Sequence, residues 1–390
     1  MTVKTLTKED LWDQVVGGAV LSTRGGMANR ERFDAAVDPV FNRGLKVTLT
    51  SPDQIPDDSI VFIGAGIGGG LEREMVEMYP RYVPTEGRFK QVDRVFPFPR
   101  WAEIPTPEWR DVPEKRLIQL TGEPFAYMPF EMTGTAYSAA IRAAEKGKTF
   151  IDADTAGYRA VPEVSLSTLN AVHAPITPFI VSTTWGDLSV WEKVLSWQRA
   201  EDIMRGIARH AGGNCSLTMW VRGSVLKAGV THNTVSMSID IGRAIRRAKE
   251  RNRDPVEAAL GATKGFKIFE GTVAGFTREG KGSFSWGKSY IEGTGEFKGH
   301  DLQIWYKNEN QVSWLDGKPY VACPDPINVL DKKTGYGIAN TEADFTAGRE
   351  VVVIALKAAP LWRTERGLKI YNPKHFGFDM PYVPAEELVK

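Results

Sequence analysis

The chain has few of the residues that build disulfide-bonded or zinc-binding scaffolds. Its 390 residues include two cysteines, Cys215 and Cys323, and neither has a second Cys or His near it at zinc-finger spacing. A disulfide framework and a structural zinc site are therefore not indicated, and a reducing cytoplasm is the expected location. The five histidines form no H-x-x-x-H or H-E-x-x-H pair, which excludes a zincin-type metal site.

The chain also lacks an excess of charge and a long apolar run. Lysine and arginine number 49 against 48 acidic residues, a net charge of +1, so nucleic acid is not an expected partner. The longest apolar run, residues 60–71, is rich in glycine and falls short of the roughly 18–20 residues that span a bilayer. Residues 1–13 are charged throughout and do not resemble a secretory signal. We expect no membrane partner.

The length and the residue pattern predict two domains. Strands alternate with helices over residues 1–172, which indicates an α/β domain with an open, mainly parallel sheet covered on both faces. Residues 173–390 are predicted to form a β-rich domain with helical segments. A capping box at Thr7 opens the first helix. Predicted strands lie at 59–63, 125–130, 148–151 and, as several short ones, at 265–360; predicted helices lie at 71–78, 137–146, 164–172, 191–210 and 239–253.

A glycine-rich stretch follows the first strand of this predicted sheet. Gly64, Gly66 and Gly69 satisfy G-x-G-x-x-G, the pattern with which a loop before a helix holds a pyrophosphate. No acidic residue ends a second strand about 20 residues on, as a dinucleotide site requires. No P-loop lysine follows either, so we predict that no nucleotide is needed. The loop is expected to leave room for a small ligand, with these substrate-binding candidates: Gly66, Gly68, Gly69, Gly70 and Thr133.

Acidic side chains gather at the predicted carboxyl ends of the strands. Glu131, Asp152 and Asp154 each follow a strand, and Glu163 lies close behind a glycine turn. Open α/β sheets bind ligands at that edge, so we expect the four carboxylates and the glycine loop to line one cleft. Carboxylates in such a cleft shift one another's pKa values, which separates a base from an acid. The alternative for each residue is helix capping.

Two other features have mainly structural interpretations. Cys215 follows two glycines and an asparagine, but no histidine is near it in sequence, so an inert buried thiol is favoured over a nucleophile. The eleven tryptophans fit a core or a subunit interface better than a ring-stacking site. We expect a homo-oligomer.

Five groups of residues, taken in their order and spacing, resemble one known family. They are the 64–70 glycine stretch, Pro129-Phe130-Glu131, Ile151-Asp152-Ala153-Asp154 running on to Pro162-Glu163, Ile241-Gly242-Arg243-Ala244-Ile245, and Ala359-Pro360-Leu361-Trp362-Arg363-Thr364 followed by Phe376-Gly377. The chain is similar to the S-methyl thiohydantoin desulfurase family, which was long catalogued as a domain of unknown function and is found beside hydantoinase and oxoprolinase genes. The family has an α/β N-terminal part and a β-rich C-terminal part.

The resemblance implies a hydrolase that acts on a small five-membered cyclic amide or thioamide. The family's named reaction converts an S-methyl thiohydantoin to a hydantoin and methanethiol. In this chain Asp154 or Glu163 is expected to act as the base, while Asp152 and Glu131 position the substrate or a divalent metal ion. Two departures from the family pattern, at residues 132–136 and around Tyr158, lie beside the expected pocket, so the heterocycle and the leaving group stay open.

A second interpretation comes from a different functional class. The strongly basic helix near residues 243–253 could be an interface. The chain would then be a non-catalytic subunit or a small-ligand-binding module that partners an oxoprolinase-like or hydantoinase-like enzyme. A solvated helix face explains the same residues more simply.

Overall fold

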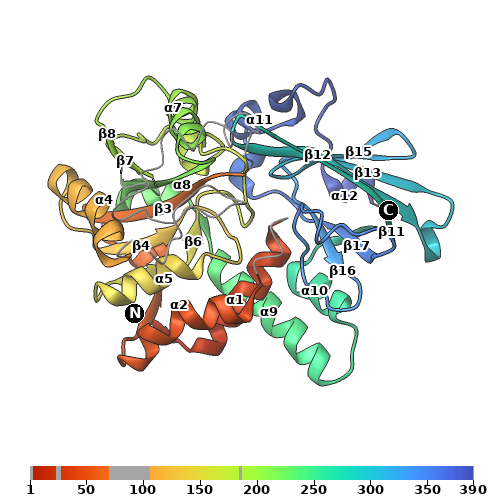
Figure 1. Ribbon diagram of the computed structural model, residues 1–390, viewed down its shortest axis with the longest axis horizontal. Helices are drawn as coiled ribbons and strands as arrows, with labels where there is room; N and C mark the ends of the chain where they lie inside the picture. The colour runs from red at the N-terminus through yellow and green to blue at the C-terminus, as the bar shows by residue number, and fades with distance from the viewer. Residues whose placement is uncertain (1–2, 23–27, 70–105, 184–186, 390) are drawn as a thin grey trace, which may run out of the picture.

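The protein is built around two β-sheets. The computed structural model describes residues 3–22, 28–69, 106–183 and 187–389, and for 106–110 the backbone alone. In Figure 1 the elements of the first half lie toward one end of the long axis and the β-rich last third toward the other. The mixed α/β class and the β-rich C-terminal part are confirmed.

The first sheet is mixed and not mainly parallel as predicted. Its described strands run in the order β1-β2-β5-β4-β3-β9-β7-β8. The pairs within β2-β5-β4-β3 are parallel, whereas β1, β9, β7 and β8 join antiparallel. In chain order the strands are β1 (Lys4–Leu6), β2 (Val47–Thr50), β3 (Ile60–Gly68), β4 (Ala126–Pro129), β5 (Thr149–Ile151), β7 (Phe179–Ser182), β8 (Leu188–Trp191) and β9 (Asn214–Arg222).

Apolar side chains cover both faces of this sheet. Val61 and Ile63 of β3 face one hydrophobic cluster, which includes Met204 of α7, and Phe62 between them faces the other, with α1, α5 and α9. The alternation is the period-2 pattern of a buried strand. The helices of this part are α1 (Lys8–Leu21), α2 (Arg30–Asn42), α4 (Thr106–Thr121), α5 (Tyr137–Glu145), α6 (Thr168–Ala171), α7 (Trp197–His210), α8 (Gly223–Gly229), α9 (Thr234–Glu250) and α10 (Pro255–Thr263).

Two glycines let α1 and α9 approach closely. A Cβ atom at Gly17 would lie 1.8 Å from the carbonyl oxygen of Ser238, and one at Gly242 would lie 1.9 Å from that of Asp13. The capping box at the start of α1 forms as predicted, since Thr7 and Asp10 exchange side-chain and backbone hydrogen bonds. The helix therefore begins where the local sequence indicates.

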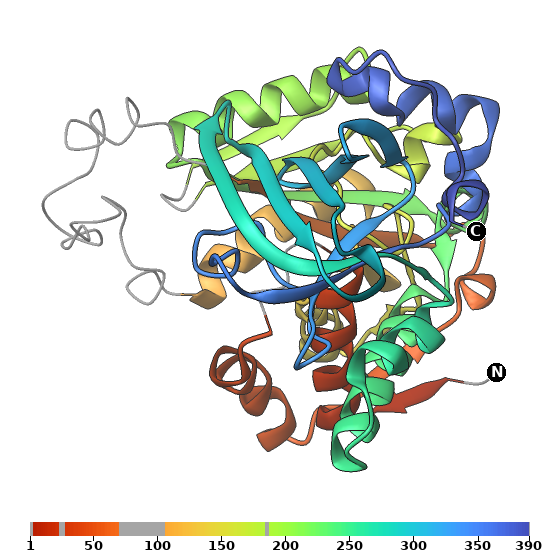
Figure 2. The same cartoon turned by 90° about the vertical axis from the view of Figure 1, so that its right-hand side faces the viewer.

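The second sheet is antiparallel throughout its described strands. Their order is β15-β14-β13-β12-β11-β17-β16, and Figure 2 shows the long strands β11 and β12 curving across the molecule. Their bounds are β11 (Phe266–Lys281), β12 (Phe284–Gly293), β13 (Asp301–Lys307), β14 (Glu309–Leu315), β15 (Lys318–Ala322), β16 (Ile327–Asp331) and β17 (Glu350–Ala355). A two-stranded pair, β6 (Ala153–Asp154) with β10 (Thr231–His232), and the short helices η8 (Pro373–Phe376), α11 (Glu365–Ile370) and α12 (Ala385–Leu388) complete the elements used below.

Residues 64–68 of the glycine stretch belong to a strand and not to the predicted loop. β3 continues to Gly68 because β9 pairs with it along its whole length, from Ile60 opposite Arg222 to Gly68 opposite Asn214. Gly70 and the predicted helix at 71–78 lie outside the described residues.

The structure also differs from the predicted helix at 164–172 and from the predicted grouping of strands. Only Thr168–Ala171 of the predicted helix at 164–172 is α-helical. Strands β7, β8 and β9 all follow residue 172, yet they belong to the first sheet. The predicted division into residues 1–172 and 173–390 therefore separates strands that share one sheet.

Candidate functional site

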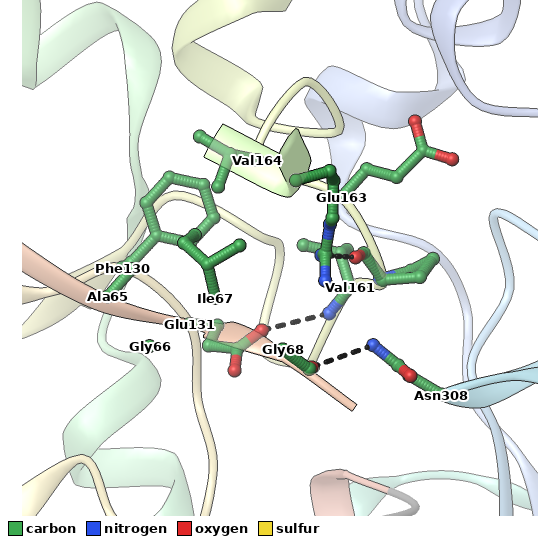
Figure 3. A pocket seen from close by; sticks show the side chains of 12 residues that line it. Ala65, Gly66, Ile67, Gly68, Phe130, Glu131, Val161, Glu163, Val164 and Asn308 are labelled. Carbon is green, nitrogen blue, oxygen red and sulfur yellow. Dashed lines mark hydrogen bonds between the residues drawn. The ribbon is translucent and has the colours of Figure 1, made fainter. Parts of the chain in front are cut away.

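A pocket lies where the two sheets meet. Its empty volume is about 290 Å³, part of which is open to solvent. Strand β3 forms one wall, the 161–164 segment and α7 form another, and Asn308 at the turn between β13 and β14 completes it. Figure 3 shows the following lining residues, of which all but Pro162 and Arg205 are labelled: Ala65, Gly66, Ile67, Gly68, Phe130, Glu131, Val161, Pro162, Glu163, Val164, Arg205 and Asn308.

Two glycines, Gly66 and Gly68, alternate with Ala65 and Ile67 on the β3 side of this pocket. Among the described residues, a Cβ atom at Gly66 would have no atom within 4 Å, so this glycine borders open space. Gly68 is crowded instead, since a Cβ there would lie 2.6 Å from the carbonyl oxygen of Gly213. Asn308 ties the end of β3 to the second sheet, because its Nδ2 donates to the Gly68 carbonyl oxygen at 3.2 Å. The predicted substrate-binding residues Gly66 and Gly68 thus both reach the pocket.

The other predicted substrate-binding residues lie elsewhere. Gly69 borders the Asn308 side chain, whose Oδ1 would be 2.0 Å from an added Cβ, and Gly70 is outside the described residues. Thr133 is buried against α1, where its carbonyl oxygen accepts from Gln14 Nε2 at 2.9 Å. Thr133 does not line the pocket.

Glu131 contributes a carboxylate to the pocket. It follows β4, and its Oε2 accepts from the backbone N–H of Val161 at 3.0 Å. Figure 3 shows this carboxylate directed at the 161–164 segment, beside Gly68. A hydrogen bond from a backbone N–H fixes the orientation of the carboxylate, which keeps its negative charge.

Glu163 also lines the pocket, but its carboxylate points away from Glu131 (Figure 3). It accepts from Lys307 Nζ at 2.5 Å, from His375 Nε2 at 3.1 Å and from Ser165 Oγ at 3.0 Å. Burial opposes its ionised form, but the hydrogen bond from His375 and the charge of Lys307 outweigh burial and lower the pKa of Glu163 to about 2. A carboxylate with this pKa and three donors is a weak base.

Asp154 is completely buried and holds a turn. Its two oxygens accept the backbone N–H groups of Ala156, Gly157 and Tyr158 at 2.7, 2.6 and 2.9 Å. Burial raises the pKa of Asp154 to about 6, against the opposing effect of these hydrogen bonds. Asp154 does not line the pocket.

Asp152 caps α9 from a distance. Its carboxylate accepts from the backbone N–H of Ser236 at 2.9 Å and from the Ser236 hydroxyl at 2.5 Å, in the first turn of that helix. This is the helix-capping alternative left open by the sequence, with a carboxylate at the positive end of the helix. The expected single cleft therefore includes Glu131, Glu163, Gly66 and Gly68 but neither Asp152 nor Asp154.

Two residues that the sequence did not single out complete the surroundings of Glu163. The ammonium group of Lys307 lies 3.9 Å from the ring centre of Phe284, 4.8 Å from that of Trp286 and 5.9 Å from that of Phe376. His375, from η8, lies far from the other histidines in sequence. The one local signal for it was its position directly before the Phe376-Gly377 pair of the family pattern.

Reasoning from the sequence also missed a second charged pair, which Arg205 forms with Glu201. Arg205 and Glu201 sit one turn apart on α7, almost fully buried, with Arg205 Nε 2.5 Å from Glu201 Oε1. They hold both flanks of Glu163, because Arg205 donates to the Pro162 carbonyl oxygen and Glu201 accepts the Val164 N–H at 2.7 Å. An i, i+4 Glu–Arg pair usually indicates an exposed helix face, so the sequence pattern concealed this role.

The remaining candidate nucleophile and metal sites have little support. Cys215 lies inside β9, and burial raises the pKa of its thiol to about 12, which makes it a poor nucleophile. In the part of the chain that the structure describes, no group of three or more His, Cys, Asp or Glu side chains is arranged to hold a metal ion. None of the described helices combines the length and the apolarity that crossing a membrane requires.

Fold and pocket together define a two-sheet α/β protein with a small polar cavity at the junction of its sheets. The chain belongs to the S-Me-THD-like family: the family's N-terminal domain matches residues 106–193 and its C-terminal domain matches residues 195–385. The resemblance to the S-methyl thiohydantoin desulfurase family is thereby confirmed. The two family domains meet near residue 194.

A solved structure supports the fold over the whole chain. A crystal structure of a protein from Chromobacterium violaceum is similar over 98% of this chain and 99% of that one, with a TM-score of 0.69 and 19% sequence identity. At this identity the likeness concerns the fold alone. No curated protein matches the chain.

Proposed function

We propose that this protein hydrolyses a small five-membered cyclic amide or thioamide, of which an S-methyl thiohydantoin is the model substrate. The observation that carries the proposal is the position of the Glu131 carboxylate, which the Val161 N–H holds in the same pocket as the open backbone of Gly66. The cavity is small and partly open to solvent, so the proposal is limited to a small ligand.

In this proposal Glu131 is the general base. It takes a proton from a water molecule whose oxygen forms a bond to the ring carbon that bears sulfur. The carbon–sulfur bond then breaks, and the methanethiolate that leaves takes the proton held by Glu131. The hydroxyl proton left on the ring carbon moves to the ring nitrogen, so that the carbon becomes the new carbonyl group. The products are the hydantoin ring and methanethiol, and a positioned base of this kind contributes about 10²- to 10⁴-fold.

The geometry favours Glu131 over the carboxylates expected from sequence to be the base. Asp154 is fully buried and engaged by three backbone N–H groups, and Glu163 is ionised by two basic neighbours on the far side of the 161–164 segment. We assign both to holding the chain in place around the pocket. No step requires a metal ion.

The first test is turnover by the purified protein alone. We expect release of methanethiol from an S-methyl thiohydantoin, followed with a thiol reagent, and formation of the hydantoin. Glu131→Gln should lower the rate by about 10²- to 10⁴-fold, as loss of a general base does. Glu123→Gln, an exposed carboxylate before β4, is the matched control and should keep full activity. Equal rates in both variants would contradict the role of Glu131.

The alternative, a non-catalytic subunit that docks through the basic helix, has weaker support. Arg243 Nη2 of α9 lies 2.7 Å from Asp10, and Arg246 bonds both carboxylate oxygens of Asp13 at 2.9 and 3.0 Å. Much of the helix's positive charge is thus neutralised by α1 within the chain. Binding of an S-methyl thiohydantoin or a hydantoin without turnover would favour this alternative. Cytoplasmic location and homo-oligomeric assembly stay predictions.

A further inference from the structure

Arg205 is held in place on several sides at the pocket wall. Its Nε donates to Glu201 Oε1, its Nη1 to the Ser283 carbonyl oxygen at 3.1 Å and its Nη2 to the Pro162 carbonyl oxygen at 2.5 Å. The guanidinium carbon lies 3.8 Å from the ring centre of Phe284, so the group is also covered on one face. The side chain is 10% exposed. Its orientation is therefore set by the fold before any ligand arrives.

The Arg205 guanidinium has more N–H donors than the acceptors of the described chain engage. An arginine has five N–H donors. Three are engaged by Glu201, Ser283 and Pro162, and no other residue of the described chain accepts from Arg205. Because Phe284 covers one face of the group and Arg205 lines the pocket, we infer that the remaining N–H groups face the pocket. A buried donor without an acceptor is costly, which favours a ligand that supplies one.

The charges around Arg205 favour a neutral hydrogen-bond acceptor over an anionic one. Glu201 neutralises the guanidinium, and the Glu131 carboxylate also lines the cavity. An anionic ligand would therefore meet a guanidinium whose charge Glu201 already balances. A neutral carbonyl oxygen accepts hydrogen bonds without needing a balancing charge.

We propose that Arg205 donates to the ring carbonyl oxygen of the substrate and so determines specificity for cyclic amides. This inference rests on the proposed function. When water adds to the carbon that bears sulfur, the electron pair of the adjacent carbon–nitrogen double bond moves to the ring nitrogen. That nitrogen shares the charge with the neighbouring carbonyl oxygen. Fixed donors at this oxygen stabilise the developing charge without rearranging.

The test is binding of three matched rings by isothermal calorimetry. Hydantoin has two ring carbonyl groups, whereas 2-imidazolidinone and 4-imidazolidinone each lack one of them. Wild-type protein should bind one of the two analogues about 10- to 100-fold more weakly than hydantoin, the factor expected for a lost hydrogen bond to a charged group. Arg205→Lys should weaken hydantoin by a similar factor but leave binding of that analogue unchanged. Arg199→Lys, exposed on the same helix, is the control and should behave as wild type.

A second variant keeps the test decisive if Arg205→Lys does not fold. Breaking a buried pair leaves a lone charge, so the double variant Glu201→Gln with Arg205→Met replaces both partners together. If the folded variants bind all three rings as wild type does, Arg205 is not the donor, although the proposed function stands. If folded wild-type protein binds none of the rings, the proposed function fails, and the assignment of Arg205 fails with it.

Discussion

Lys307 donates to the carboxylate of Glu163 across 144 positions of sequence, with the two atoms 2.5 Å apart and both side chains at most 10% exposed. The pair joins the last residue of β13 to the segment that forms a wall of the pocket. Through it the antiparallel sheet helps to place backbone that belongs to the first part of the chain. The Val161 N–H that orients Glu131 lies in the same segment.

Removing Lys307 should destabilise the protein. Lys307→Met leaves Glu163 as a buried carboxylate with His375 as its remaining basic neighbour, and breaking a buried ion pair typically costs about 3 kcal/mol or more of the free energy of unfolding. Urea denaturation followed by circular dichroism measures the change. Lys369→Met is the matched control, because its partner Glu365 is 86% exposed and such pairs contribute little. Equal losses in the two variants would show that burial of the pair does not matter.

Asp154 should make stability depend on pH in a defined window. Its pKa is raised from 3.8 to about 6 in the folded protein, so the folded state holds this proton more tightly than the unfolded state. The contribution is complete below pH 3.8 and is lost as the pH rises through about 6. The free energy of unfolding of wild type should therefore fall across this window relative to that of Asp154→Asn.

The same variant tests what Asp154 does. An amide offers one acceptor oxygen to a turn that uses both carboxylate oxygens, so Asp154→Asn should lose about 1–3 kcal/mol of stability. Turnover by the folded variant should stay within a few-fold of wild type. A drop of about 10²-fold or more without loss of stability would instead restore Asp154 as the base.

Gly66→Ala should block the ligand without disturbing the fold. The added methyl group meets no described atom within 4 Å, so unfolding should be unchanged. If the ring lies over this backbone, the methyl group displaces it, and a displacement of about 1 Å can cost roughly 100-fold in rate. Gly64→Ala is the control on the same strand, where the nearest described atom is 4.0 Å away and the pocket is not reached. Full activity in Gly66→Ala would place the ring elsewhere.

Gly242→Ala should weaken the packing of α1 against α9. Its methyl group would lie 1.9 Å from the Asp13 carbonyl oxygen, so the helices must separate. Overpacking of this kind costs about 1–3 kcal/mol, seen as a lower melting temperature. Gly261→Ala in α10, with no described atom within 4 Å, should instead stabilise its helix slightly, by up to about 1 kcal/mol. Unchanged melting in Gly242→Ala would mean that the helices adjust without cost.

Local patterns predicted the elements whose causes are local. The Thr7 capping box starts α1, and strands β4 and β5 with helix α5 lie where apolar runs and flanking glycines indicated. The glycine stretch failed this test because its partner, β9, begins at Asn214. A run of glycines favours a loop when it is considered alone, and the pairing partner that makes it a strand is nearly 150 residues away.

The sequence by itself determined the family, the two kinds of sheet-forming region and the presence of carboxylates near Glu131 and Glu163. Only the tertiary structure decided which of these carboxylates reach the pocket, because the role of each one depends on the hydrogen-bond donors that surround it. Backbone N–H groups hold Asp154 and Ser236 binds Asp152, whereas Lys307 and His375 ionise Glu163. Arg205 was hidden for the same reason. Its place in the pocket wall depends on packing between segments that are distant in the chain, and no spacing within the sequence encodes that distance.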